Sequence, residues 1–155
     1  MSSDKAHITD EEGQALVEFA LVLPVLILVL FGAIHFGRAF NYWNDETHLT
    51  AEAARFAAVN RKPDPSSALT LQQQIKNQAD AADLKSGASV CVSFPNSPSG
   101  TPAPVAGDPV QVRMSFLFNW IPLIGTKVGV GSTTITSSTV MRLEAQPTNF
   151  AAGCA

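Results

Sequence analysis

The sequence predicts an α+β protein. It would have a long N-terminal helix that spans a membrane and continues as an amphipathic helix, then a second short helix and a small antiparallel sheet. Three observations predict this fold. Residues 19–37 contain no Asp, Glu, Lys or Arg. Apolar residues then recur at helical spacing to about Asn60. Beyond Gly87 the pattern changes to an alternation of apolar and polar residues, which is typical of strands.

The uncharged stretch is long enough to cross a bilayer. Its helical length of about 28 Å is close to the hydrocarbon thickness of roughly 30 Å. A secretory signal peptide is the rival interpretation, but such peptides begin with basic residues and end at a small-residue cleavage site. This chain begins acidic, and aromatic residues and Arg38 follow the stretch. We therefore expect a retained transmembrane helix over residues 14–37, after an N-terminal segment (1–13) whose first twelve residues are disordered and before a domain at 38–155.

The membrane helix is expected to continue without a break, so that one helix runs from Gln14 to about Asn60, with Pro24 tolerated inside it. Past the membrane, four residues mark one helical face that packs on the domain: Tyr42, Leu49, Ala53 and Phe56. The charged residues of this segment should lie mostly off that face: Asp45, Glu46, Glu52 and Arg55.

The rest of the chain predicts one helix and three strands. After the Pro63–Pro65 turn, a serine N-cap introduces a helix over Ala68–Leu84, which Gly87 closes. The strands are Ser89–Phe94, Val110–Phe118 and Thr133–Leu143. Proline-rich Pro95–Pro109 and glycine-rich Asn119–Gly131 connect them as loops. The inward residues of the first two strands should be Val90, Val92 and Phe94, then Val110, Val112, Met114, Phe116 and Phe118.

Composition and motifs speak against several functions. The net charge is −3, all of it within residues 1–13, and no basic cluster indicates nucleic-acid binding. No nucleophile elbow, phosphate loop or CxxC pair indicates catalysis. His48 with Asp45 and Glu52 could form a metal site, but we interpret this set as a solvated polar face. We expect a protein that is not an enzyme and that uses no cofactor or metal.

Glu18 is the most informative residue, because an ionisable group at membrane depth is costly and is functional by default. It lies five residues after Gly13, at the start of the apolar run. The alternative is a glutamate at headgroup level that merely ends an ordinary membrane anchor.

These residues resemble a known processing site. Gly13-Gln14, followed by Glu18-Phe19, is similar to the site at which a prepilin peptidase cuts type IV prepilins. The continuation Phe19–Pro24 and the exit Phe36–Arg38 resemble the TadE-like family, the minor pilins or pseudopilins of bacterial tight-adherence (Tad) pili. More loosely, Arg38–Arg61, Leu117–Gly125 and Val140–Glu144 look similar to that family as well.

The resemblance implies a role and a location. Residues 1–13 would be a leader cut off between Gly13 and Gln14, and Glu18 would pair with the new α-amine of a neighbouring subunit. Phe19 belongs to the same motif. The expected partners are the lipid bilayer, a prepilin peptidase, other pilin or pseudopilin subunits and the Tad machinery. The protein would be a single-pass protein of the bacterial cytoplasmic membrane, with residues 38–155 outside the cytoplasm or in the pilus. An uncleaved single-pass assembly factor and a membrane-tethered enzyme are the alternatives.

Two further features bear on the location. The basic residues favour the opposite orientation, since Lys5 stands alone before the helix whereas Arg38 and others follow it. Cys91 and Cys154 are the only cysteines. If the domain is exported, they are expected to form one disulfide; two free thiols are the alternative. Orientation therefore stays open from the sequence.

Overall fold

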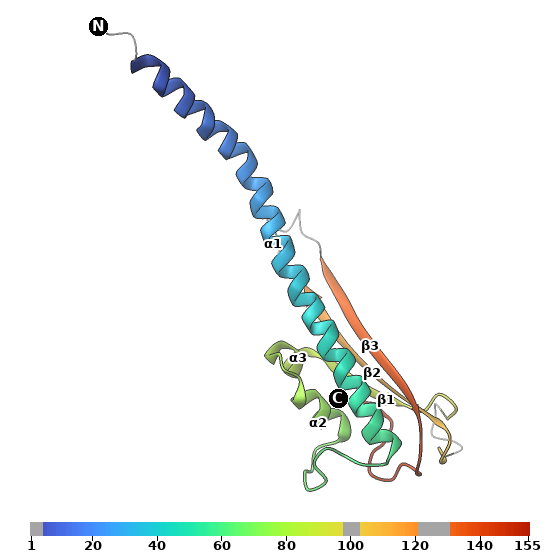
Figure 1. The fold of residues 1–155 in the computed structure, drawn as a ribbon. Coiled ribbons are helices and arrows are strands. Elements are labelled where there is room, and N and C mark those ends of the chain that lie inside the picture. The colour runs from blue at the N-terminus through green and yellow to red at the C-terminus, as the bar shows by residue number, and fades with distance from the viewer. Residues whose placement is uncertain (1–4, 98–102, 121–130) are drawn as a thin grey trace. The chain divides into compact units, whose positions relative to one another are not determined.

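The computed structural model confirms the α+β fold (Figure 1). It describes residues 5–97, 103–120 and 131–155, with the backbone alone for residues 5–12. The chain divides into two compact units, Met1–Arg38 and Ala39–Ala155. The elements, in chain order, are α1 (Lys5–Ala58), α2 (Leu71–Gln78), α3 (Ala82–Gly87), β1 (Ser89–Ser93), β2 (Pro109–Asn119), β3 (Ser132–Arg142) and β4 (Gly153–Cys154).

Helix α1 is continuous through Pro24, as expected, but it begins at Lys5 rather than at Gln14. The prediction that the N-terminal segment is disordered was therefore wrong for residues 5–12. The physical reason is that Lys, Ala and Glu, which occur in this segment, favour helix and that no proline precedes Gly13. Within the described residues, α1 is the one helix long and apolar enough to cross a membrane, judged by length and composition.

The C-terminal part of α1 belongs to the second unit and lies along one face of the sheet (Figure 1). Thr50 Oγ1 contacts Ser137 Oγ at 3.1 Å, and Thr139 Oγ1 donates to Thr50 Oγ1 at 3.3 Å. The predicted packing face is confirmed, since Tyr42, Leu49 and Ala53 are buried and Phe56 is half-buried against the same core. The apolar stripe of α1 therefore fixes which side of the helix meets the sheet.

The sheet is antiparallel, with the strand order β3-β2-β1-β4. The predicted inward residues of β1 and β2 are buried, apart from Phe116, which is half-buried. Each predicted strand agrees with the observed one to within one residue at either end. Strand β4 was missed, because two residues are too short to show an alternation.

The helix predicted over Ala68–Leu84 was wrong, because the chain forms two shorter helices there. Helix α2 begins after Thr70, whose side chain forms a capping box with Gln73, so the cap is a threonine rather than a serine. The chain leaves helical geometry at Ala79, and the Asp80 N–H donates to Asp45 Oδ2 on α1 at 2.9 Å. This contact with a distant residue replaces the helical hydrogen bond that continuation would have required.

Gly87 is the last residue of α3, and it matters there for space rather than for a left-handed turn. A Cβ at this position would lie 3.0 Å from Phe116 Cε2 on β2. The glycine therefore lets α3 approach the sheet closely.

Most of the two predicted loops lies outside the described residues: positions 98–102 of the first and 121–130 of the second. Residues 103–108 of the first loop are irregular, in agreement with the prediction, but Pro109 begins β2. A proline is tolerated at the first position of a strand.

Candidate functional site

The predicted processing site lies within the exposed first part of α1. Gly13 and Gln14 are helical, and apart from the adjoining residues and backbone of its own helix, no described atom lies within 4 Å of where a Gly13 Cβ would stand. Gln14 Nε2 donates to Glu18 Oε1 at 3.4 Å, one helical turn away. The structure thus places Gln14 and Glu18 on the same side of the helix, where a carboxylate at position 18 reaches the residue that would become the new N-terminus.

The apolar side chains that follow, Phe19 among them, are exposed in the single chain. Between Leu16 and Ile34 the large apolar residues are 38–73 % exposed. A contiguous apolar surface of this size is unusual on a soluble monomer and marks a surface that binds lipid or other protein. The arrangement is consistent with a single-pass membrane anchor.

The two cysteines are joined in the second unit. Cys91 and Cys154 are directly opposite each other in the β1–β4 pair and form a disulfide. Val90 and Ala155 exchange two backbone hydrogen bonds beside it, of 2.9 and 3.0 Å. The bridge therefore fastens the C-terminal residues to the sheet, and it points to an oxidising compartment outside the cytoplasm.

Glu46 was predicted to lie off the packing face, and this was wrong: its side chain has no solvent exposure. Neither carboxyl oxygen has a hydrogen-bond partner. Burial, and secondarily the charge of Asp45, raises the pKa of the Glu46 carboxyl to about 8. The signal was present in the sequence, because position 46 is four residues after Tyr42 and three before Leu49, on one helical face.

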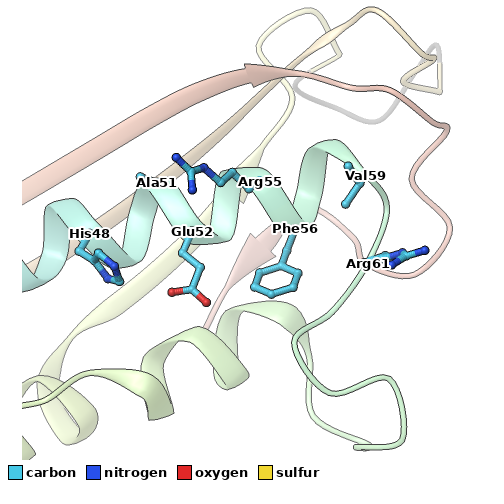
Figure 2. A pocket seen from close by; sticks show the side chains of 7 residues that line it. All are labelled: His48, Ala51, Glu52, Arg55, Phe56, Val59 and Arg61. Atoms are coloured by element: carbon cyan, nitrogen blue, oxygen red, sulfur yellow. The ribbon is translucent and has the colours of Figure 1, made fainter.

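A groove of about 550 Å³ runs beside the C-terminal part of α1 (Figure 2). His48, Glu52 and Phe56 point toward α2 in this view, and Arg55 and Arg61 line other parts of the groove. The Asp45 carboxylate, which the possible metal set required, accepts the Asp80 N–H instead. Among the described residues, no group of three or more His, Cys, Asp or Glu side chains is placed to hold a metal ion.

The sequence profile of TadE-like proteins matches residues 13–55, less than a third of the chain. The match begins at Gly13 and ends at Arg55, so the C-terminal segments that loosely resemble the family lie beyond it. No curated protein and no solved structure matches the chain significantly.

The match covers the exposed apolar part of α1 and the stretch that begins to pack on the sheet. It therefore spans the glycine, the glutamate and the membrane-length apolar run that the sequence singles out. Over residues 13–55, this chain is therefore similar to the TadE-like family.

Proposed function

We propose that this protein is a membrane-anchored minor pilin or pseudopilin that takes part in assembly of a Tad-type pilus. A prepilin peptidase cuts it between Gly13 and Gln14 and removes residues 1–13. Residues 14–37 cross the bacterial cytoplasmic membrane, and residues 38–155 face away from the cytoplasm. The subunit acts by binding other pilin or pseudopilin subunits and the assembly machinery through its helix, rather than by catalysis.

One observation carries the proposal: a glycine at the start of the matched TadE-like domain, with a carboxylate five residues later on an exposed apolar helix. A charge in this position is costly in lipid unless a partner compensates it. The α-amine that cleavage creates on a neighbouring subunit is such a partner. The exposed apolar surface of α1 supplies the packing that would bring the two chains together.

The disulfide supports the proposed orientation against the count of basic residues. Cys91 and Cys154 both follow the membrane helix, and disulfides persist in oxidising compartments and are rare in the cytosol. The rule for basic residues counts only those near the membrane ends, and here it rests on one residue before the helix and Arg38 after it. The disulfide is therefore a stronger argument about orientation than the count of basic residues.

The experiment is the intact mass of the protein from native membranes of cells with and without the cognate peptidase. We expect loss of residues 1–13 only in cells that have the peptidase. Gly13→Ala should leave the full precursor, because the peptidase requires a residue with almost no side chain at the cut. Gly32→Ala is the matched control, since Gly32 lies on the same helix with open space around it and should not affect cleavage.

The alternative is an uncleaved single-pass assembly factor of the Tad apparatus. The continuation of α1 back to Lys5 favours this alternative, because the predicted cut then lies inside a helix. An unchanged mass in both cell types, with the protein still needed for pilus formation, would establish the alternative and reject the processed subunit.

A further inference from the structure

Two neighbouring aromatic side chains of the second unit remain uncovered. Phe40 and Trp43 lie one helical turn apart on α1 and are 56 % and 47 % exposed. Their ring centroids are 5.7 Å apart, so the rings touch each other. Tyr42, between them in sequence, is buried against Phe116 and Phe118. Helix α1 therefore presents one face to the sheet and leaves this aromatic pair outside.

Trp43 also carries a polar group, the indole N–H, that remains available for hydrogen bonding. No hydrogen bond among the described residues engages its indole N–H, whereas the Trp120 indole N–H donates to Thr133 Oγ1 at 3.0 Å. A half-exposed tryptophan with an apolar ring and a free N–H suits a boundary that is apolar on one side and wet on the other. The pair thus has the chemistry of side chains enriched at membrane–water interfaces.

The position of the pair along α1 agrees with such a boundary. The uncharged stretch ends at Gly37, and α1 continues through it without interruption. Phe40 and Trp43 follow Gly37 by three and six residues, which is roughly 4.5 and 9 Å of helix rise. The polar region of a bilayer occupies roughly the first 5–8 Å outside the hydrocarbon on each side. A helix tilt of about 30°, within the range seen for transmembrane helices, brings Trp43 within that depth.

We propose that Phe40 and Trp43 form an interfacial anchor in the lipid headgroup region of the leaflet that faces the domain. The occupant is phospholipid, because the pair continues directly from the apolar stretch that enters the bilayer. The anchor fixes how deeply the helix sits and keeps the domain at the membrane surface before any assembly. It rests on the membrane-anchoring part of the proposed function and requires neither cleavage nor a pilus.

The test is depth-dependent quenching of Trp43 fluorescence. The full chain carrying Trp120→Phe, which leaves Trp43 as the sole tryptophan, is reconstituted at low density in phosphatidylcholine–phosphatidylglycerol vesicles. Separate samples contain lipids with a nitroxide on the headgroup, at a shallow acyl position or at a deep acyl position. We expect the largest loss of emission with the headgroup or shallow label and a much smaller loss with the deep label.

A matched control places the probe just past the C-terminal end of the same helix, which is Ala58. Val59 is also half-exposed on the second unit, sixteen residues after Trp43. A chain with Val59→Trp and both native tryptophans changed to phenylalanine should lose no emission to any lipid label. Because Trp120 packs on Phe118, Trp43→Phe alone provides a second comparison that does not depend on the Trp120 change. In this variant, the part of the tryptophan emission that headgroup and shallow nitroxides quench in the wild-type chain should be absent.

Three results would overturn the anchor. Trp43 emission that lipid nitroxides leave unchanged and aqueous iodide quenches fully would place the pair in water. Quenching that weakens as the protein-to-lipid ratio rises, with a blue-shifted emission, would assign the pair to contact with a second copy. Release of the chain from vesicles by alkaline carbonate would reject the membrane anchor and with it the proposed function. The first two results, with the chain still inserted, would reject the interfacial anchor alone.

Discussion

Glu46 is a carboxyl group that the fold buries in surroundings unfavourable to its charged form. A buried carboxylate without a partner is strongly unfavourable, so the group takes up a proton instead. At neutral pH the side chain is therefore mostly uncharged, which its pKa of about 8 expresses. Nothing in the residue type predicts this state. It depends on the sheet that covers this face of α1, which only the folded chain provides.

Glu46→Gln should remove a pH dependence from the stability of the domain. The folded form binds the Glu46 proton more tightly than the unfolded form, whose pKa is near 4.5. The free energy of unfolding should therefore fall as pH rises from about 4.5 to about 8, by an amount on the order of a few kcal/mol. The amide cannot ionise, so the variant should lack this decline. Thermal unfolding in detergent between pH 5 and 9 measures it.

Asp45→Asn provides the control for that measurement. It removes the second cause of the raised pKa but keeps an oxygen that can accept the Asp80 N–H. The decline should remain and still begin near pH 4.5, but it should end at a lower pH and be smaller. A Glu46→Gln chain that loses stability with pH as steeply as the wild type would contradict the assignment to Glu46.

Glu18 is the second carboxyl whose surroundings matter, but its proposed charge partner lies on another molecule. Glu18→Ala should leave membrane insertion intact, because removing a charge makes the apolar run more favourable in lipid. Assembly should be lost, since the α-amine of the neighbouring subunit would lack a counter-charge. Glu18→Asp should be intermediate. Membrane fractionation and a pilus count by microscopy, in a strain without the wild-type copy, measure both effects.

Gln14→Ala separates the charge from the local contact. It removes the hydrogen bond from Gln14 to Glu18 and keeps the carboxylate, so pili should still form. Normal pili with Glu18→Ala would show that the carboxylate is only a headgroup-level residue.

At the scale of elements, β4 depends on covalent and side-chain support, because two residues form few backbone hydrogen bonds. Gln72 Nε2 donates to the carbonyls of Ala151 and Gly153, and Phe150 contacts Phe94. The disulfide adds the strongest constraint. It joins residues 63 positions apart, and so restricts a large part of the unfolded chain.

Changing both Cys91 and Cys154 to serine should lower the free energy of unfolding by about 4 kcal/mol, from the length of the closed loop. Urea unfolding with and without reductant measures this effect. The wild-type chain should lose stability when it is reduced, and the double variant should not respond to reductant. Two alkylatable thiols in freshly isolated native membranes would contradict both the bridge and the export of the domain.

The elements also show what the sequence could predict. The boundaries of β1, β2 and β3 followed from the alternation of apolar residues, because each strand has one face on the core. The break between α2 and α3 could not be predicted, since local propensity favours helix through Ala79–Ala82. A hydrogen bond to Asp45, thirty-five positions away, decides the conformation there.

For the whole molecule, the two units differ in what they need from their surroundings. The second unit has its own core, formed by α1 after Arg38 together with α2, α3 and the sheet. The first unit is an apolar helix whose large side chains are exposed. The sequence pattern led to a different partition, with a leader over residues 1–13, a membrane helix over residues 14–37 and a domain over residues 38–155, and this partition stays a prediction. The sequence could not predict what covers the apolar surface of the first unit, because the covering molecules are not part of this chain.

Residues 39–155 alone, expressed in an oxidising compartment, should fold as a soluble domain. The core is complete within this range, and the disulfide lies inside it. Size-exclusion chromatography should give a monomer and near-UV circular dichroism a defined tertiary signal. Aggregation despite an intact disulfide would show that the domain needs the preceding helix or a partner.

The continuity of α1 through Gly13 has a consequence for the proposed cleavage. A peptide bond inside a helix must be pulled out of its hydrogen bonds before a peptidase can reach it, and glycine lowers the cost of unwinding by about 1 kcal/mol relative to alanine. The cut then turns the middle of a helix into its beginning. The nitrogen of residue 14 becomes an ammonium group, and the amides of residues 15–17 lose their acceptors, so the new charge coincides with the positive pole of the helix dipole. Removing the leader would thus give the helix a concentrated positive end at the membrane, and Glu18 carries the nearest negative charge on the same chain.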